Sequence, residues 1–481
     1  MSASMYFYDL ETSGISAKNC RIMQFAGQRV DLDLKKIGEP DNYLIKMTTD
    51  VLPEPEAILI TGITPQQTFD SGISEAEFLT YFHKSIALPD TIFIGFNSIH
   101  FDDEFVRFLN YRNFYDAYEW QWQDGRSRWD MLDVARMTRA LRPEGIKWPF
   151  ASDGKPSNKL ELIASVNNLM HEKAHDALSD VNATIALAKL IRQKQPKLYE
   201  YLFKIRDKRT VEKIVSQTEP FVYTSGQYGS QFESTTIALT VASHPTQKGS
   251  VFVYDLRYDP SPYADKKPSE LAELLAKYHP QDDEEFLPVK QLQFNRCPAV
   301  APLSVLDESS SSRLSLDMKK IEQNAKALIS MSKFSDNLAE AIKINEKQKQ
   351  TSFVTDVQDV DSQLYDGFFN ESDKNKMKSV RMADENKLAD LHPDFNDGRL
   401  DKLLLLYKAR QFPKCLSQDE QKIWEDYRIM KLTNGGDQSQ LAKYFSKINE
   451  LSTRTDLNEP QIYLLEELKL YGESLAPYSS D

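Results

Sequence analysis

Polar and apolar positions follow different patterns in successive parts of the chain. In the first part, short apolar runs typical of strands alternate with segments whose apolar residues recur every three or four positions, as in helices. The predicted strands cover residues 5–9, 24–31, 43–47 and 91–97. The predicted helices cover residues 75–86, 102–110, 130–141, 159–168 and 176–193. This alternation predicts an α/β domain over residues 1–193.

The pattern then changes twice. After a basic run at 197–213, strand-like stretches are predicted at 220–224, 235–242, 250–255 and 288–294, with helices near 269–278 and 316–346. Residues 346–352 are polar, and this composition predicts a linker. Helical patterns follow at 372–382, 399–410, 419–430, 439–450 and 460–473. We therefore expect a β-containing domain with appended helices over 197–350, and a helical domain over 351–481.

Two acidic residues, Asp9 and Glu11, end the first predicted strand. Residues i and i+2 of a strand face the same side, so both carboxylates are expected to project together. They repel each other unless a cation lies between them. The alternative is a solvated pair on an edge strand, but the strand before it is too apolar for an edge.

Asp102 begins a predicted helix that follows the apolar strand 91–97. It is a candidate metal ligand, or else an acid that is stabilised by the positive end of the helix dipole. The sequence favours neither interpretation of Asp102. For Asp103 and Glu104 we prefer the second.

Asp180 lies beside the apolar stripe of the predicted helix 176–193. His175 is five residues before Asp180, and this spacing does not place two side chains on the same face of a helix. Four carboxylates suit Mg²⁺ or Mn²⁺, which prefer oxygen ligands. Two such ions can clamp the attacking water and the leaving oxygen of a phosphodiester. A histidine can take the proton from that water. The set therefore predicts phosphodiester hydrolysis.

Composition narrows the class of protein. The chain has 481 residues, 41% hydrophobic and 27% charged, which is ordinary for a globular protein of two to four domains. No apolar run is long enough to cross a bilayer, and candidate catalytic residues begin too early for a signal peptide. Three scattered cysteines argue against a disulfide framework and for a reducing cytoplasm.

The net charge of −13 is unusual for a nucleic-acid binder, but a local basic track matters more than the total. Residues 101–142 interleave arginines with aromatic residues, a mixture that single-strand binders use to follow the backbone and stack on bases. We expect about half of these aromatic residues to be core, because so dense a cluster cannot all face DNA. The candidate substrate contacts here are Arg107, Tyr118, Trp122 and Arg136.

The set Asp9, Glu11, Asp102, His175 and Asp180 resembles the active site of the DEDDh exonucleases, whose fold is ribonuclease H-like. Longer motifs resemble the bacterial exonuclease I family, which degrades single-stranded DNA. They are FDDE at 101–104, YRNFYD at 111–116, RWD at 128–130, LRPEG at 141–145, AHDA at 174–177 and VDSQLYDGFF at 360–369. This resemblance spans nearly the whole chain.

The resemblance implies a ribonuclease H-like exonuclease domain, then an SH3-like domain, then a C-terminal helical domain. It implies that four carboxylates hold two Mg²⁺ ions, for which Mn²⁺ can substitute, and that His175 is the general base. It also implies a processive, single-strand-specific 3′→5′ exodeoxyribonuclease that releases 5′-mononucleotides and acts in DNA repair and recombination. We expect the accessory domains to close the nuclease groove into a passage for a single strand.

Two positions depart from the family pattern. Lys159 lies where the family usually has a basic substrate contact, often Arg; Lys keeps the charge but not the bidentate fork. Ser13 stands where a bulky residue is expected, which puts a stacking contact there in doubt. Glu11 is also expected to contact the substrate.

The resemblance further implies that the chain binds the acidic C-terminal tail of single-stranded DNA-binding protein, in a cleft between the nuclease and SH3-like domains. Arg142, and more weakly Arg313, are candidates to hold the terminal carboxylate. Each is at least as readily interpreted as a solvated or DNA-facing arginine. We expect a cytoplasmic monomer with no membrane partner.

Two other functions are weighed against this one. A related DEDDh enzyme that acts on RNA or proofreads a polymerase would usually be much shorter and lack the motif at 360–369. A non-catalytic DNA scaffold is disfavoured because all five catalytic positions carry the required residue types.

Overall fold

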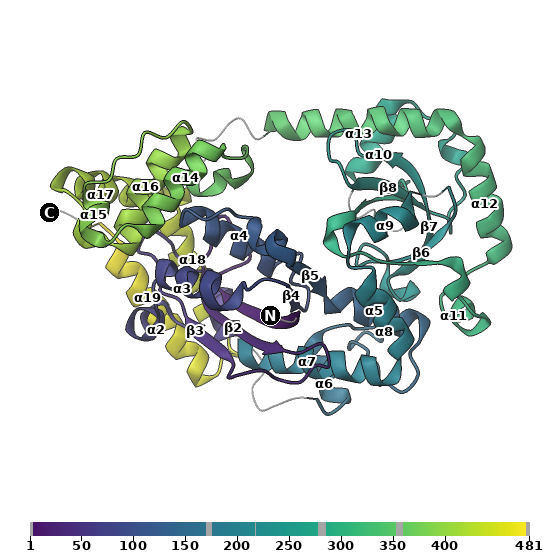
Figure 1. Cartoon of the computed structure of the whole chain (residues 1–481), viewed down its shortest axis with the longest axis horizontal. Coiled ribbons are helices and arrows are strands. Elements are labelled where there is room, and N and C mark those ends of the chain that lie inside the picture. Colours follow the sequence, from purple (N-terminus) through teal and green to yellow (C-terminus); the bar gives the residue numbers. More distant parts are fainter. Residues whose placement is uncertain (1–2, 170–175, 217, 278–284, 353–358, 478–481) are drawn as a thin grey trace. The chain divides into compact units, whose positions relative to one another are not determined.

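The structure is a computed structural model that describes residues 3–169, 176–216, 218–277, 285–352 and 359–477 (Figure 1). The described residues form two compact units. The first unit takes its residues from the ranges 1–127, 171–182 and 358–481, and the second from 128–170 and 183–357. Residues near both ends of the sequence therefore belong to one unit.

The first unit contains a sheet in the order β3–β2–β1–β4–β5. Its strands are β1 (Ser4–Thr12), β2 (Ile22–Val30), β3 (Asp41–Leu44), β4 (Thr91–Gly95) and β5 (Ser127–Asp130), where the chain leaves this unit. The central strand β1 runs antiparallel to β2 and parallel to β4. The four strands predicted in this region are confirmed, and the central position of β1 explains its apolar aromatic run.

Helix α4 (Asp102–Arg112) lies between two hydrophobic clusters. On one side, Phe105 and Leu109 join an aromatic cluster with residues of the sheet. On the other, Phe108 and Tyr111 join a cluster formed with helices from the C-terminal part of the chain. A helix that is apolar on two faces needs packing partners on both.

The C-terminal helices of the first unit confirm the predicted helical pattern. They are α14 (Glu371–Met382), α16 (Gly398–Gln411), α17 (Gln418–Thr433), α18 (Gln440–Ser452) and α19 (Glu459–Leu475). Leu403, Leu404, Leu406 and Tyr407 of α16 are buried in the cluster that also contains Tyr111. Helices from the end of the chain therefore complete the core around α4.

The second unit contains a sheet in the order β10–β6–β7–β8–β9, in which neighbouring strands are antiparallel. The strands are β6 (Phe221–Thr224), β7 (Thr235–Ser243), β8 (Ser250–Asp255), β9 (Val289–Gln293) and β10 (Ala299–Pro302). The first four were predicted. Strand β10 was missed because it is short, rich in alanine and bordered by Pro298 and Pro302, which are weak strand signals.

Several helices of the second unit match the prediction. They are α5 (Met131–Leu141), α6 (Leu160–Val166), α10 (Pro268–Ala276) and α7 (Ala177–Lys194), along which the chain passes from the first unit into the second. The single helix expected over 316–346 is wrong, because Met331 separates two helices, α12 (Met318–Ser330) and α13 (Ser332–Ser352). The break lets Leu328 and Phe334 enter the same core.

Two further segments, for which no helix was predicted, are helical. The basic run at 197–213 forms α8 (Pro196–Lys204) and α9 (Lys208–Val215), which bury Leu198, Leu202, Val211 and Val215. The linker expected at 346–352 is instead the last part of α13. Among the residues that the structure describes, no helix combines the length and the apolar character needed to cross a membrane.

Candidate active site

Strand β1 presents two different faces. Tyr6, Tyr8 and Leu10 belong to the aromatic cluster of the sheet. Asp9 and Glu11 therefore lie on the opposite face, where both side chains are partly buried. The structure places this pair of carboxylates as the strand period predicts.

Asp180 lies in the first turn of α7. Before it, Oδ2 of Asp176 accepts a hydrogen bond from the backbone N–H of Ser179 at 3.1 Å and so caps the helix. The other oxygen of Asp176 accepts a hydrogen bond from the side-chain amide of Gln24 at 3.2 Å. Because Gln24 is paired with Glu11 in the sheet, this contact ties the helix of Asp180 to the strand beside Glu11.

Asp9, Glu11 and Asp180 each offer a carboxylate oxygen, and these oxygens lie within 4.8 Å of one another. Asp102, the first residue of α4, is buried, and its charge raises the pKa of both Asp9 and Glu11. The four predicted carboxylates therefore belong to one electrostatic site. His175 lies outside the described residues.

The carboxylates oppose one another's ionisation. Burial, and then the charges of Asp102 and Asp180, raise the pKa of Asp9 well above its usual range. Burial and the same two charges raise the pKa of Glu11 to about 8. A divalent cation removes this repulsion, and a set of carboxylate oxygens is the donor set that hard cations prefer. The residues therefore fit a divalent metal ion.

The sequence did not single out Asp176 as part of this site. Its charge also contributes to the raised pKa of Asp9 and Glu11. The sequence feature that could have identified Asp176 is its position four residues before Asp180, at the start of the same helix.

Besides favouring the start of helix α4, Asp103 connects this helix to strand β1. Its carboxylate is buried, accepts the hydroxyl of Tyr8 at 2.5 Å and lies 3.8 Å from the guanidinium of Arg107. Tyr8 precedes Asp9 in β1, so this hydrogen bond fixes the start of α4 against the strand. Asp103 thereby helps to hold Asp102 near Asp9.

The aromatic residues at 101–142 divide between the core and the surface, as expected. Tyr111, Phe114, Trp120 and Trp129 are buried. Trp122 is 63% exposed and provides a free aromatic face. About half of this cluster is therefore core, as predicted for an aromatic-rich stretch.

The predicted substrate contacts in the first unit have different surroundings. Arg107 is 9% exposed and binds Glu104 and Gln121, so protein partners occupy its guanidinium. This position argues against a direct contact with DNA. The ring of Tyr118 lies 5.8 Å from that of Phe368, which is 87% exposed. Phe368 belongs to the motif at 360–369, but the sequence did not identify it as a candidate contact.

The two predicted substrate contacts in the second unit, Arg136 and Lys159, also have different surroundings. Arg136 pairs with Asp133 at 2.7 Å and packs against Gly226, where a Cβ atom would lie only 2.8 Å from the guanidinium. Lys159 is largely exposed, with Nζ 3.8 Å from a carboxylate oxygen of Glu161. Lys159 is therefore the more accessible cation.

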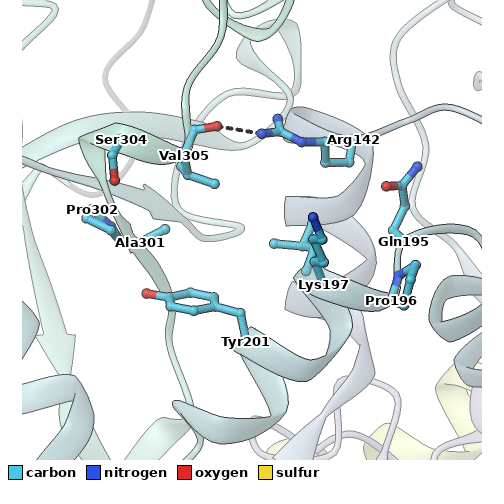
Figure 2. Close-up of a pocket in the computed structure, with 10 residues that line it drawn as sticks. Arg142, Gln195, Pro196, Lys197, Tyr201, Ala301, Pro302, Ser304 and Val305 are labelled. Carbon is cyan, nitrogen blue, oxygen red and sulfur yellow. Dashed lines mark hydrogen bonds between the residues drawn. The ribbon is translucent and has the colours of Figure 1, made fainter.

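A pocket of about 550 Å³ lies in the second unit, beside α8 and β10 (Figure 2). Its walls combine apolar groups with two basic side chains. They are formed by Arg142, Gln195, Pro196, Lys197, Leu198, Tyr201, Ala301, Pro302, Ser304 and Val305. Such a pocket suits a ligand that is apolar in one part and anionic in another.

The two arginines predicted to bind a partner are placed differently. Arg142 lines the pocket, donates to the carbonyl oxygen of Val305 at 2.8 Å and lies 3.3 Å from Asp307. Arg313 donates to the carbonyl oxygen of Ala140 at 3.1 Å and does not line the pocket. Lys197, which the sequence placed only in a basic run, is a pocket residue.

Family models match three successive parts of the chain. Residues 6–188 match a model described as Exonuclease, residues 206–343 the Exonuclease I SH3-like domain, and residues 358–475 the Exonuclease I C-terminal domain. The predicted fold class is confirmed by these matches.

Similar proteins match along the whole length. Exodeoxyribonuclease I of Haemophilus influenzae is 37% identical over 477 residues, which are 98% of each chain. A crystal structure of Escherichia coli Exonuclease I with a dA16 oligonucleotide has a TM-score of 0.93 and 36% identity, covering 99% of this chain and 100% of the other. A structure of SSB/Exonuclease I with an inhibitor has a TM-score of 0.89 and 35% identity over the same shares.

The raised pKa of Glu11 predicts how the metal-free protein responds to pH. A folded-state pKa of about 8, against an ordinary value of 4.5, contributes stability that is fully present below about pH 4.5 and lost as the pH rises through about 8. We expect Glu11→Gln to raise the melting temperature of the metal-free protein by about 2–4 °C at pH 8, and by less near pH 5. Calorimetry in a chelator measures this difference.

Glu39→Gln is the matched control, because Glu39 is exposed and is not one of the groups whose charge raises the pKa of Asp9 or Glu11. It makes the same change of formal charge and should leave the melting temperature unchanged across this range. A difference between Glu11→Gln and the unsubstituted protein that does not vary with pH would contradict the assignment.

Proposed function

The chain belongs to the exonuclease I family of DNA exonucleases, and we propose on this basis that it degrades single-stranded DNA from the 3′ end and releases 5′-mononucleotides. The observation that carries the proposal is the cluster formed by Asp9, Glu11 and Asp180 with the nearby charge of Asp102. The crystal structure of the Escherichia coli relative with a DNA oligonucleotide supports the choice of substrate.

The cofactor that we propose is a pair of Mg²⁺ ions, for which Mn²⁺ can substitute. Asp9, Glu11, Asp102 and Asp180 would hold them, since these side chains supply only oxygen ligands. When bound, such ions stabilise the charge that develops on the attacking and leaving oxygens. The chain's part is to hold the carboxylates on rigid elements, two on β1 and one each at the starts of α4 and α7.

His175 is the proposed general base. It would accept a proton from the attacking water while the water oxygen bonds to phosphorus. The bond from phosphorus to the 3′ oxygen of the penultimate nucleotide then breaks, which releases a 5′-mononucleotide and leaves a strand one nucleotide shorter. The resemblance of the AHDA motif to that of the family supports this role.

Exposed aromatic side chains support binding of a single strand. Trp122 and Phe368 each present most of their ring to solvent, and Tyr118 lies beside Phe368. Stacking of a base on such a ring contributes about 1–3 kcal/mol. We propose these three residues, with Lys159 as a cation, as contacts for the DNA strand.

The pocket beside α8 is the proposed site for the acidic C-terminal tail of single-stranded DNA-binding protein. Arg142 and Lys197 supply positive charge, and Leu198 and Pro302 supply apolar wall. The SSB/Exonuclease I structure supports this partner. Arg313 remains the weaker candidate, because it points to a backbone carbonyl rather than lining the pocket.

We propose that the enzyme is a processive cytoplasmic monomer that acts in DNA repair and recombination. Cys20, Cys297 and Cys415 are not joined by disulfide bonds, which supports a reducing compartment. The similarity to exonuclease I relatives along the whole chain supports the proposed processivity, the monomeric state and the role in DNA repair and recombination.

Substrate and direction can be tested together with a single strand labelled at its 5′ end. With Mg²⁺ we expect products that shorten from the 3′ end on single-stranded DNA, and little cutting of a duplex or of RNA. Asp9→Asn should lower the rate by about a hundredfold or more, because it removes a metal ligand. Faster cutting of RNA would indicate a ribonuclease, and equal activity of Asp9→Asn would indicate that these carboxylates are not catalytic.

The role of His175 predicts a change in pH dependence. The rate of the unsubstituted enzyme should fall as the pH drops below about 6.5, because a protonated imidazole cannot accept a proton. His175→Ala should lower kcat by about a hundredfold or more with little change in DNA affinity, and should lose this dependence. The measurement is kcat against pH for both proteins, and parallel profiles would exclude this role.

Partner binding can be tested with a fluorescent acidic peptide that ends in a free carboxylate. Lys197→Ala and Arg142→Ala should each weaken binding by about tenfold, while the hydrolysis of a short free strand is unchanged. The exposed Lys333 of α13 does not line the pocket, so Lys333→Ala is the matched control. Equal peptide affinity in all three variants would place the tail elsewhere.

A further inference from the structure

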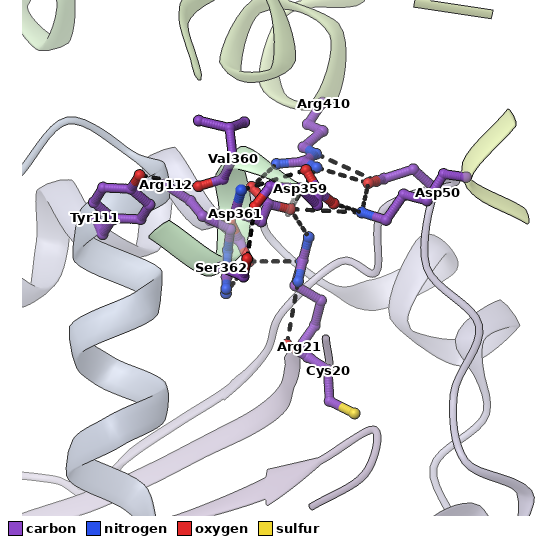
Figure 3. A network of polar contacts seen from close by, with 12 residues as sticks. Cys20, Arg21, Asp50, Tyr111, Arg112, Asp359, Val360, Asp361, Ser362 and Arg410 are labelled. Carbon is purple, nitrogen blue, oxygen red and sulfur yellow. Dashed lines mark hydrogen bonds and ion pairs between the residues drawn. The ribbon is translucent and has the colours of Figure 1, made fainter. Parts of the chain in front are cut away.

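Apart from Phe368, whose exposed ring is a proposed DNA contact, the residues of the motif at 360–369 have been given no role. Its first half is the 3₁₀ turn η8 (Val360–Tyr365), and the carboxylate of Asp361 lies between two arginines (Figure 3). Its Oδ2 accepts hydrogen bonds from Arg21 at 2.8 Å and Arg410 at 2.7 Å, and its Oδ1 accepts another from Arg410 at 2.9 Å. All three side chains are at most 2% exposed.

These three residues belong to a larger network of ion pairs, most of which is buried. Arg410 also donates to Asp50 at 2.6 Å, and Lys431 pairs with Asp50 at 2.9 Å and with Asp359 at 2.8 Å. Burial raises the pKa of Asp361, but the charges of Arg410 and then Arg21 outweigh burial and hold it far below its usual range. Asp361 is therefore a fixed negative charge between cations from distant parts of the sequence.

Arg21 connects this network to the catalytic strand. The backbone N–H of Ser13 donates to the carbonyl oxygen of Arg21 at 2.9 Å, and the backbone N–H of Arg21 donates to Oγ of Ser13 at 2.9 Å. Next to this closed turn, the pairing of β1 with β2 shifts at a bulge between Glu11 and Thr12. Because a bulge sets the direction of adjacent side chains, the anchored Arg21 fixes the backbone that aims Glu11.

The same turn, η8, also holds the helix that carries Asp102. The hydroxyl of Tyr111, in the last turn of α4, donates to the carbonyl oxygen of Val360 at 2.9 Å. The hydroxyl of Tyr365 donates to the carboxylate of Glu104, in the first turn of α4. Both ends of α4 are therefore tied to η8.

We propose that Asp361 is a positioning residue for the metal site, which it serves by fixing Glu11 and Asp102 relative to each other. Glu11 is held through the turn closed by Arg21, and Asp102 through the contacts of α4 with η8. The inference rests on the proposed metal-dependent hydrolysis. Carboxylates that bind metal ions must keep their geometry to within a few tenths of an ångström, and supporting contacts supply that precision.

A role in stability alone explains the network less well. Removing charges from water is unfavourable, and well-packed apolar residues of similar volume are often as stable as a buried ion pair. Ion pairs add a defined geometry that apolar contacts do not. Here that geometry joins the strand turn at Arg21, the helix α16 at Arg410 and the turn η8.

The test is the affinity of the full-length protein for Mn²⁺, measured from the electron paramagnetic resonance signal of the free ion. Asp361→Asn should weaken binding by about tenfold and raise the metal concentration for half-maximal hydrolysis by the same factor. The KM for DNA should not change, because Asp361 is buried away from solvent. A merely structural residue would change the melting temperature and leave the Mn²⁺ affinity of the folded protein unaltered.

Glu420→Gln is the matched control. Glu420 pairs with the buried Lys408 at 3.0 Å in the same set of C-terminal helices, and within the described residues its carboxylate accepts hydrogen bonds from Lys408 and Ser417, which lie outside η8 and the turn at Arg21. It should lower the melting temperature and leave Mn²⁺ affinity unchanged.

If Asp361→Asn does not fold, Tyr111→Phe tests the inference instead, because this substitution removes one hydrogen bond between α4 and η8 and keeps every charge. It should weaken Mn²⁺ binding by about threefold. Unchanged Mn²⁺ affinity in the folded variants overturns the inference. An unsubstituted protein that neither binds Mn²⁺ nor cuts DNA overturns the proposed function instead.

Discussion

The repulsion among carboxylates at the end of β1 is the constraint on which the candidate active site depends. Burial and neighbouring negative charges raise the pKa of Asp9 and Glu11, so these groups keep their charge together only when a cation is present. Without a cation, the raised pKa values favour the protonated forms of Asp9 and Glu11. The hydrogen bonds from Tyr8 to Asp103 and from Gln24 to Asp176 hold the neighbouring helices beside the sheet.

The sequence predicted the parts of the site that follow from local periodicity. Asp9 and Glu11 share a face because a strand repeats every two residues, and Asp180 follows from the helical stripe beside it. Contacts between distant segments were not accessible in this way. Arg107 lies in a stretch whose composition is typical of DNA contacts, but its hydrogen bond with Gln121 depends on how α4 packs against a later segment.

The fold shows the same division between local patterns and distant contacts. Strands β1 to β4 and the C-terminal helices were predicted from apolar patterns, whereas the short strand β10 and the break at Met331 depend on which apolar groups fill one core. The largest omission is the pair formed by Arg21 and Asp361, which are 340 residues apart. The sequence marked 360–369 only as a family motif, and no local pattern pairs two single charges over that separation.

The two-sided packing of α4 has a consequence for protein synthesis. Its Tyr111 packs in one cluster with Leu403, so roughly 290 residues must be added before that face can be covered. At about 5–20 residues per second, this takes roughly 15–60 s on the ribosome. Once Asp180 has been added, the emerging chain contains all four carboxylates of the candidate site but still lacks Asp361 and the helices that cover this face of α4. The nascent chain therefore cannot complete the core around α4, or the contacts of Asp361 with Arg410, until α16 has been made.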